Sequence, residues 1–313
     1  EERRERARQD FTFFRRAYFP HYCLVGGDSR LHEWLDTELP RMADAPEGVR
    51  LAIAAPRGEA KSTFVSLFFV LWAVLTGRKH YILIIADALE QAVSLLGAVK
   101  DELEFNEALK RDFPGAGKGH VWNVGTVVTP GNVKIQALGA GKRMRGLRHG
   151  PHRPDLIVLD DLENDGNVDK PEQRDKLQSW LQKTVLNLGA ADGSMDVVYV
   201  GTLLHYDSVL ARTLRKPLWK ARTFRSILRW PDRMDLWDEW ESLLSSRGEA
   251  EARRFYRQHR AKMEAGAEVS WPASRPLYRL MCLRVEDREA FDSEQQNDPL
   301  SANEAPFNGC ITF

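Results

Sequence analysis

One loop of the sequence combines residue types that bind phosphate. Lys61 and Ser62 follow Gly58 in a loop between the apolar run 51–55 and a longer apolar run that begins at Phe64. A buried strand, a tight loop and a helix in this order hold phosphate oxygens on backbone N–H groups and on a lysine ammonium. We expect Lys61 to contact the β- and γ-phosphates of a nucleotide and Ser62 to place its hydroxyl on Mg²⁺. The predicted nucleotide-contacting residues are Pro56, Arg57, Gly58, Glu59, Ala60, Lys61, Ser62 and Thr63.

The loop departs from the usual motif G-x-x-x-x-G-K-[ST] at both glycines. Ala55 and Ala60 occupy those two positions. Alanine at position 60 is harder to accommodate than glycine where the backbone approaches phosphate closely. Taken alone, the loop is therefore also compatible with an ordinary strand, turn and helix that contain a Lys-Ser pair.

A second run of residues supplies the carboxylates that nucleotide hydrolysis needs. The apolar residues 156–159 precede Asp160, Asp161 and Glu163. A buried strand ending in a carboxylate delivers Asp160 to the sheet edge where ligands bind in α/β proteins, and there it would hold Mg²⁺. We expect Asp161 to orient the attacking water because of its position, with Glu163 as the rival because of its longer reach. A solvated, inert acidic turn is the alternative. Two half-motifs on buried strands, in the right order, favour nucleotide hydrolysis.

Three arginines and a threonine are further candidates for the site. Arg57 either stabilises charge on the γ-phosphate or forms a salt bridge, to Glu59 or to an acid at the end of the second strand. Arg145 and Arg148 lie in the glycine-hinged basic loop 139–150, which could reach the nucleotide of a neighbouring subunit or a DNA phosphate, or be a solvated loop. Thr202 follows the buried strand 195–200 and is placed to sense the γ-phosphate.

The elements that must position these residues predict an α/β fold. Apolar runs at 51–55, 81–86 and 156–159, and the segment 195–200 in which Asp196 alone is charged, are typical of strands covered on both faces. A helix with an apolar face at residues 92, 96, 99 and 103 follows the second run, and a hairpin is predicted around Pro130-Gly131-Asn132. Asp169 and Glu172 suggest a capping box at the start of another helix. This alternation predicts a mostly parallel central sheet flanked by helices. Together with the phosphate-binding loop and the acidic strand end, we expect a P-loop NTPase fold of the ASCE type.

The chain is expected to have three parts. Residues 1–230 form the P-loop core, which begins with an aromatic element at 11–21 and a helix at 31–39. Residues 231–291 are charge-rich and helix-like, with several tryptophans, and predict a small helical lid subdomain. Residues 292–313 are rich in Asn, Asp, Ser and Pro and are predicted to be a linker.

Composition narrows the function. The 313 residues carry 45 basic and 45 acidic side chains, so no global attraction to nucleic acid is expected and any such contact must be local. The longest apolar stretch is about 12 residues, whereas a membrane span needs roughly 20. Three scattered cysteines (Cys23, Cys282 and Cys310) form no metal or disulfide pattern and suit a reducing compartment.

The ordered set of motifs resembles the large subunit of tailed-bacteriophage terminase, the DNA-packaging motor. Beyond the two motifs above, the matching segments are the aromatic residues 11–21, Ala86-Asp87 with Glu90-Gln91-Ala92, Arg145-Gly146-Leu147-Arg148, Gly201-Thr202, Trp271-Pro272, and Gln296-Asn297-Asp298-Pro299. The family tolerates non-glycine residues in its phosphate loop. Its loop arginine is matched by Arg57, its trans-acting basic residue by Arg145 or Arg148, and its coupling motif by Thr202.

The resemblance implies an ATPase that uses ATP and Mg²⁺ and acts on double-stranded DNA. Its implied partners are other copies of itself in a ring, the portal protein and the small terminase subunit, with no membrane contact. Its implied location is the host cytoplasm during virus assembly, transiently on the procapsid portal. The family's nuclease domain would begin about where this chain stops, so no DNA cleavage is expected. Asp161 departs from the family's usual glutamate, which leaves the catalytic carboxylate open.

Two other functions fit parts of the sequence. A helicase-type ATPase would share the core, although such helicases carry two tandem ATPase-like domains and the sequence suggests one. A non-hydrolysing assembly module would account for the two missing glycines of the loop.

Overall fold

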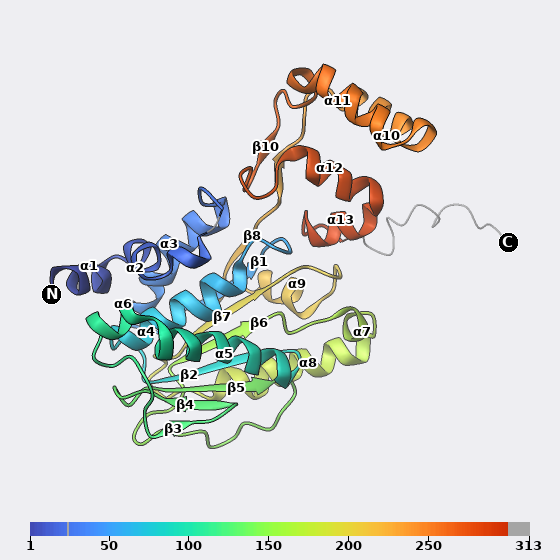
Figure 1. The fold of residues 1–313 in the computed structure, drawn as a ribbon. Coiled ribbons are helices and arrows are strands. Elements are labelled where there is room, and N and C mark those ends of the chain that lie inside the picture. Colours follow the sequence, from blue (N-terminus) through green and yellow to red (C-terminus); the bar gives the residue numbers. More distant parts are fainter. Residues whose placement is uncertain (24, 300–313) are drawn as a thin grey trace.

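A central β-sheet with helices on both faces dominates the computed structural model, which describes residues 1–23 and 25–299 (Figure 1). The strands are β1 (Arg50–Ala54), β2 (Tyr81–Ala86), β3 (Val121–Trp122), β4 (Thr126–Val128), β5 (Lys134–Gly139), β6 (Leu156–Asp160), β7 (Asp196–Gly201), β8 (Lys220–Thr223), β9 (Ile227–Arg229) and β10 (Glu268–Val269). The helices of the core are α1 (Glu2–Gln9), α2 (Phe11–Tyr18), η1 (Pro20–Tyr22), α3 (Arg30–Ala43), η2 (Thr63–Phe69), α4 (Val70–Leu75), α5 (Leu89–Phe105), α6 (Glu107–Asp112), α7 (Asp165–Val168), α8 (Pro171–Lys183), η3 (Val185–Asn187) and α9 (Val209–Leu214). Four more helices follow: α10 (Met234–Arg247), α11 (Glu249–Met263), α12 (Leu277–Glu286) and α13 (Arg288–Glu294).

The strand order fixes the fold class. The large sheet runs β3-β4-β5-β2-β6-β7-β1-β8, and the strands from β5 to β8 pair in parallel. β3 and β4 are antiparallel at one edge, and the predicted hairpin is confirmed as β4 and β5. β7 lies between β1, which leads into the phosphate loop, and β6, which ends in Asp160. In the ASCE class of P-loop NTPases, an additional strand lies between the strand that leads into the phosphate loop and the strand that ends in the acidic residue. The strand order therefore confirms the predicted fold class.

The four apolar runs became the four central strands because each of them is buried on both faces. Alternate side chains of a strand point to opposite faces, so Leu51 and Ile53 join one hydrophobic cluster while Ala52 and Ala54 join the other. The first cluster contains the helices from α1 to α6, and the second contains α8, η3 and α9. The predicted helix at 92–103 is confirmed as α5, with all four predicted apolar positions buried.

The C-terminal helices form a separate lobe above the carboxyl edge of the sheet (Figure 1). Their own hydrophobic cluster centres on Trp237, Trp240 and Leu280, and it includes Ile227 from β9. β9 pairs with β10 in a small two-stranded sheet, which the sequence did not suggest. Within the described residues, no helix has the length and apolar character needed to cross a bilayer.

Two sequence-based expectations differ from the structure. Asp169 does not cap the start of a helix but is the C-cap residue of α7: Asn164 caps the start of α7 in a capping box with Asn167, and Lys170 precedes Pro171 at the start of α8. The polar stretch after residue 292 is not linker at its start, because α13 continues to Glu294 and Gln295, Gln296 and Asn297 are buried against the core. Residues 300–313 of the predicted linker lie outside the described residues, as does Cys310.

Candidate nucleotide site

The loop between β1 and η2, residues 55–62, is called the phosphate loop after its predicted ligand. It contains two residues with left-handed backbone. Gly58 has φ +79° and Ala60 has φ +55°. Glycine adopts this conformation freely, whereas for an alanine it costs about 1–2 kcal/mol of free energy. Ala60 therefore adopts a conformation that a glycine would take without cost, and the loop retains this local strain.

Lys61 points into the site at the carboxyl edge of the sheet. Its Nζ donates to Thr202 Oγ1 at 3.2 Å and lies 3.2 Å from Asp161 Oδ2. Its side chain is almost fully buried, with 8% exposed. Thr202 in turn donates to the carbonyl oxygen of Ala55 at 3.2 Å. The ends of β1, β6 and β7 thus bring the lysine, the threonine and the acid together, as expected for neighbouring parallel strands.

Asp160 is fully buried and is held by two serine hydroxyls. Ser62 Oγ donates to its Oδ1 at 2.9 Å, and Ser66 Oγ donates to its Oδ2 at 2.5 Å. Burial, together with the neighbouring charge of Asp161, raises the pKa of Asp160 above the ordinary range of an aspartate. A cation beside the Asp160 carboxylate would stabilise its charged form, so the surroundings of Asp160 favour a positively charged ligand.

Ser62 and Asp160 fit the predicted Mg²⁺. The Ser62 hydroxyl donates its hydrogen to Asp160, which leaves the oxygen lone pairs free for a metal ion. No cluster of three or more His, Cys, Asp or Glu side chains suited to a metal occurs within residues 1–23 and 25–299. Mg²⁺ at phosphate sites is usually bound by one or two protein oxygens, substrate phosphates and water, so two ligands are sufficient.

Asp161 and Glu163 have different surroundings. Asp161 has φ +47°, lies beside Lys61 and is 31% exposed, and it lines a cavity of about 220 Å³ together with Lys61, Thr202 and Arg57. Glu163 also reaches this cavity, but its carboxylate accepts the backbone N–H of Val209 at 2.7 Å and of Leu210 at 3.0 Å. It also accepts the hydroxyl of Tyr199 at 3.2 Å. Glu163 therefore caps α9, whereas Asp161 faces the phosphate loop.

Arg57 forms a salt bridge, but not with either partner suggested by the sequence. Its Nη1 lies 2.5 Å from Glu294 Oε1 at the end of α13, and its backbone N–H donates to the Glu294 carbonyl at 2.9 Å. The Arg57 side chain is 69% exposed at the mouth of the cavity. Arg57 and Glu294 both line this cavity, so the salt bridge lies at the site itself.

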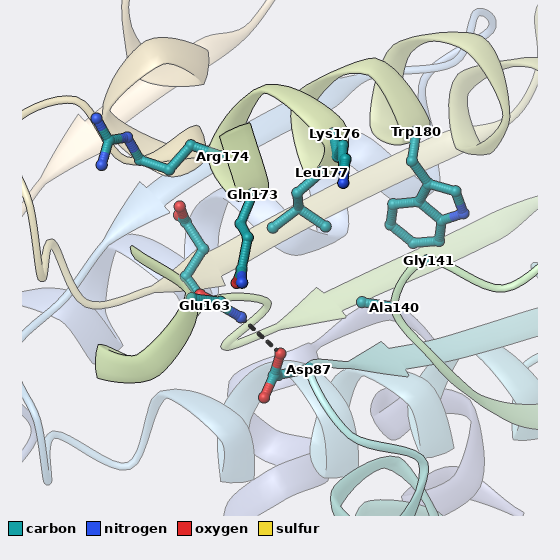
Figure 2. Close-up of a pocket in the computed structure, with 10 residues that line it drawn as sticks. Asp87, Ala140, Gly141, Glu163, Gln173, Arg174, Lys176, Leu177 and Trp180 are labelled. Carbon is teal, nitrogen blue, oxygen red and sulfur yellow. Dashed lines mark hydrogen bonds between the residues drawn. The ribbon is translucent and has the colours of Figure 1, made fainter. Parts of the chain in front are cut away.

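Arg145 and Arg148 are exposed and do not line the cavity around Lys61. Their loop passes a neighbouring cavity of about 390 Å³ between α8 and the strand ends (Figure 2). Figure 2 shows Trp180 and Leu177 of α8 facing Ala140 and Gly141 of the loop, with Asp87 on the opposite wall. The structure therefore does not place either arginine at the nucleotide site of its own chain.

Other residues at the site were not assigned by the sequence patterns. Ser66 lies inside a helix, where a buried serine gives no signal of its own. Asp87 accepts Asn167 Nδ2 at 2.9 Å and links the end of β2 to α7. Glu59 was among the predicted nucleotide-contacting residues, but its side chain is buried and does not line the cavity around Lys61: its carboxylate accepts the Ser270 hydroxyl at 3.2 Å. Burial raises the pKa of Glu59.

The strand order and the phosphate loop define the class of protein as an α/β P-loop NTPase fold. Neither the family models nor the curated proteins compared with this chain gave a match. Among solved structures, the chain is similar to the large terminase ATPase domain of Thermus phage P74-26. An arginine-to-alanine mutant of that domain gives a TM-score of 0.37 and 14% identity, over 82% of this chain and 90% of the other. The domain without that mutation gives a TM-score of 0.37 and 15% identity, over 70% of this chain and 90% of the other. The fold class therefore rests on the chain's own strand order.

Proposed function

We propose that this chain hydrolyses ATP with Mg²⁺ and that hydrolysis drives double-stranded viral DNA into a procapsid, as in the motor domain of a phage terminase large subunit. The observation that carries the enzymatic part is the meeting of Lys61, Ser62, Asp160, Asp161 and Thr202 at the carboxyl ends of β1, β6 and β7. The packaging part is supported by the ordered motifs of the sequence, above all Arg145-Gly146-Leu147-Arg148 and Gln296-Asn297-Asp298-Pro299.

The geometry supports a simple division of labour. On binding ATP, Lys61 exchanges Asp161 for the β- and γ-phosphates, which frees the Asp161 carboxylate. A water then attacks the γ-phosphorus in line, Asp161 takes its proton, and the bond from phosphorus to the bridging oxygen breaks. Mg²⁺, held by Ser62 and Asp160, would neutralise charge on the phosphates. Thr202 contacts Lys61 and is placed to sense the γ-phosphate.

The remaining roles concern neighbours. We propose that Arg145 or Arg148 acts on the nucleotide of an adjacent copy, because both are exposed and do not line the cavity of their own chain. The partners would be a ring of further copies, the portal protein and the small terminase subunit, in the host cytoplasm at the procapsid portal. Double-stranded DNA would be held mainly by its phosphates, without sequence reading.

Phosphate release from ATP tests the enzymatic proposal. Wild type should release phosphate in the presence of Mg²⁺ and DNA, and Lys61→Ala and Asp161→Asn should lose about 100-fold or more. Glu163→Gln should keep most of the activity, because Glu163 is engaged with α9. Lys118→Ala, which removes an exposed lysine paired with Glu104, is the control and should behave as wild type.

Three outcomes would change the proposal. If concentrated wild type with DNA releases no phosphate, a nucleotide-binding assembly module replaces the enzyme. If Glu163→Gln is inactive and Asp161→Asn is active, the two carboxylates exchange roles. If hydrolysis is coupled to separation of DNA strands and is indifferent to a portal, a helicase-type ATPase is the better description.

A further inference from the structure

A basic cavity lies at the edge of the sheet opposite the nucleotide site. It has a volume of about 380 Å³ and is lined by Arg50, Arg153 and the loop that leads into β7. The loop contributes Gly189, Ala190, Ala191, Gly193 and Met195, and Leu186 and Asn187 complete the wall. None of the residues proposed for ATP hydrolysis lines this cavity.

The parallel pairing of three strands explains why the two arginines face one cavity. Arg50 begins β1, Arg153 lies three residues before β6, and β7 pairs with both strands between them. All three strands start at this edge and end at Asp160, Gly201 and the phosphate loop. Strands of this length span roughly 17–20 Å, so the basic cavity and Lys61 lie on opposite edges of the sheet.

Two carboxylates at the starts of the neighbouring strands are occupied by other donors, while Glu47, three residues before Arg50, is exposed and forms no ion pair with a described residue. Asp155 accepts the backbone N–H groups of His80 and Tyr81, at 2.7 and 2.9 Å. Asp196 lies 2.8 Å from Lys79 Nζ and accepts the backbone N–H of Val49 at 2.7 Å.

The carboxylate of the loop itself is also occupied. Asp192 accepts the backbone N–H and the hydroxyl of Ser194, at 3.0 and 2.7 Å. Neither Arg50 nor Arg153 forms an ion pair with any residue that the structure describes. Because the chain has equal numbers of basic and acidic residues, two uncompensated guanidinium groups in one cavity create a local positive field that the composition hides.

The part of the cavity wall between the two arginines is formed by small residues and is open to solvent. Gly189, Ala190, Ala191 and Gly193 carry little or no side chain, and Gly193 has φ +74° with nothing within 4 Å of the position of a Cβ. Arg153 is exposed and Arg50 is half-buried. An open surface with two fork-shaped donors suits a phosphate presented by a polymer. A free phosphate ion needs a closed cage of donors to replace its water.

We infer that this cavity binds phosphodiester groups of duplex DNA. It would provide a DNA-contact surface at the edge of the sheet opposite the nucleotide site. The choice of duplex DNA as the polymer rests on the proposed function, whereas the phosphate chemistry rests on the cavity. The contact is independent of base sequence, because guanidinium groups on backbone phosphates carry no sequence information.

Binding of a fluorescein-labelled mixed-sequence duplex of about 30 base pairs, followed by anisotropy between about 50 and 200 mM salt, tests the inference. Loss of two phosphate contacts should make the slope of log K against log salt shallower by about 1.8 and weaken binding about tenfold near 100 mM salt. The variant is Arg50→Gln/Arg153→Gln, and Arg50→Lys/Arg153→Lys should recover most of the slope. The matched control is Arg233→Gln/Arg253→Gln, because these exposed arginines have carboxylate partners in Asp235 and Glu249.

Phosphate release without DNA, measured on the same proteins, separates this inference from the proposed function. If wild type hydrolyses ATP and the glutamine variant keeps the affinity and salt slope of wild type, the inference fails and the proposed function stands. If wild type does not hydrolyse ATP but the glutamine variant loses duplex binding as described, the proposed function fails and the inference stands. Two further results overturn the inference: no duplex binding by wild type at the lowest salt, or calorimetric binding of inorganic phosphate that depends on Arg50 and Arg153 while duplex binding does not.

Discussion

Asp161 and Glu163 differ by two positions in sequence and by their whole environment in the fold. Asp161 follows directly on β6, and its left-handed backbone lies beside Lys61. Glu163 points to the start of α9, where two backbone N–H groups and the Tyr199 hydroxyl converge on its carboxylate. A carboxylate at a helix N-terminus is favoured by the helix dipole as well as by these hydrogen bonds. Glu163 is thus a stabilising residue, and position favours Asp161 for the chemistry.

Removing the Glu163 carboxylate should therefore lower stability more than it changes catalysis. Glu163→Ala leaves two backbone N–H groups and a buried tyrosine hydroxyl without their acceptor, and we expect it to cost about 2–3 kcal/mol of unfolding free energy. Urea denaturation measures this cost. Asp165→Ala, an exposed carboxylate in the neighbouring helix α7, should cost less than about 0.5 kcal/mol. Equal costs for the two variants would contradict the capping role of Glu163.

The two alanines at the glycine positions of the phosphate loop allow a matched test of strain. Ala60 has φ +55°, whereas Ala55 is buried and is absent from the positive-φ residues. Ala60→Gly should raise the unfolding free energy by up to about 1 kcal/mol, because it relieves left-handed strain. Ala55→Gly makes the same chemical change without strain to relieve and should lower it by about 1 kcal/mol. Urea midpoints of the two variants should move in opposite directions, and a shift in the same direction would refute the strain at Ala60.

At the scale of elements, one carboxylate of α6 links both N-terminal helices to the core, to which they are also joined by hydrophobic packing. Asp112 Oδ2 accepts Arg3 Nε at 2.5 Å and the Tyr18 hydroxyl at 2.6 Å, so it joins α1 and α2 to α6. The Arg3 hydrogen bond, assisted by Tyr18, lowers the pKa of Asp112 to about 2. A carboxylate with a lowered pKa stabilises the fold above its unfolded value near 3.8, and this contribution is lost as the pH falls through about 2.

Asp112→Asn should consequently be destabilising at neutral pH and nearly neutral in acid. We expect a cost of about 1 kcal/mol at pH 7, allowing for solvent screening of the partly exposed Arg3, and the difference from wild type should vanish between about pH 4 and 2. Urea unfolding as a function of pH measures it. Glu107→Gln, which breaks an exposed pair with Lys110 on the same helix, should show almost no effect. A difference that persists unchanged at pH 2 would contradict the assignment.

The central strands could be predicted from the sequence because burial on both faces leaves a continuous apolar run. The placement of Lys61, Asp160 and Thr202 at one edge of the sheet was predictable for the same reason, since each comes at or after the end of such a strand and parallel strands end at one edge. β8 was not predictable, because this edge strand, Lys220–Thr223, is exposed along its whole length and has no apolar pattern.

The polar segment after α13 shows a different limit of sequence patterns. Gln295, Gln296 and Asn297 have the composition of a linker but are buried. Asn297 satisfies the backbone N–H of Leu203 and the carbonyl of Phe224, both at 2.8 Å, and so seals the end of β7 to the segment after β8. Polar side chains that serve buried backbone groups carry no periodic signal, and their partners lie far away in sequence. Glu294 and Arg275, which contact Arg57 and Gly58, were missed because these partners also lie far away in sequence.

At the scale of the whole molecule, the C-terminal lobe is attached to the phosphate loop itself. Glu294 holds Arg57, and Ser270 donates to Glu59. The guanidinium of Arg275 packs against Gly58, so closely that a Cβ added to Gly58 would lie 1.8 Å from Arg275 Nη2. Burial lowers the pKa of Arg275, whose Nη1 donates to Gln295 at 2.5 Å. These contacts join the loop to the segment before α12 and to the end of α13.

A double-mutant cycle on Gly58 and Arg275 measures this attachment. Gly58→Ala imposes left-handed strain, about 1 kcal/mol, and also displaces the Arg275 guanidinium. Arg275→Ala removes the obstacle but not the strain, so Gly58→Ala should cost about 1 kcal/mol less in that background than in wild type. Gly77→Ala is the matched control: Gly77 has φ +74° with nothing within 4 Å of its Cβ position, and its cost should be the same in both backgrounds. Urea unfolding gives the free energies, and hydrogen exchange of α13 should rise with Gly58→Ala but not with Gly77→Ala. If the two glycines behave alike in both backgrounds, Arg275 does not couple the lobe to the loop.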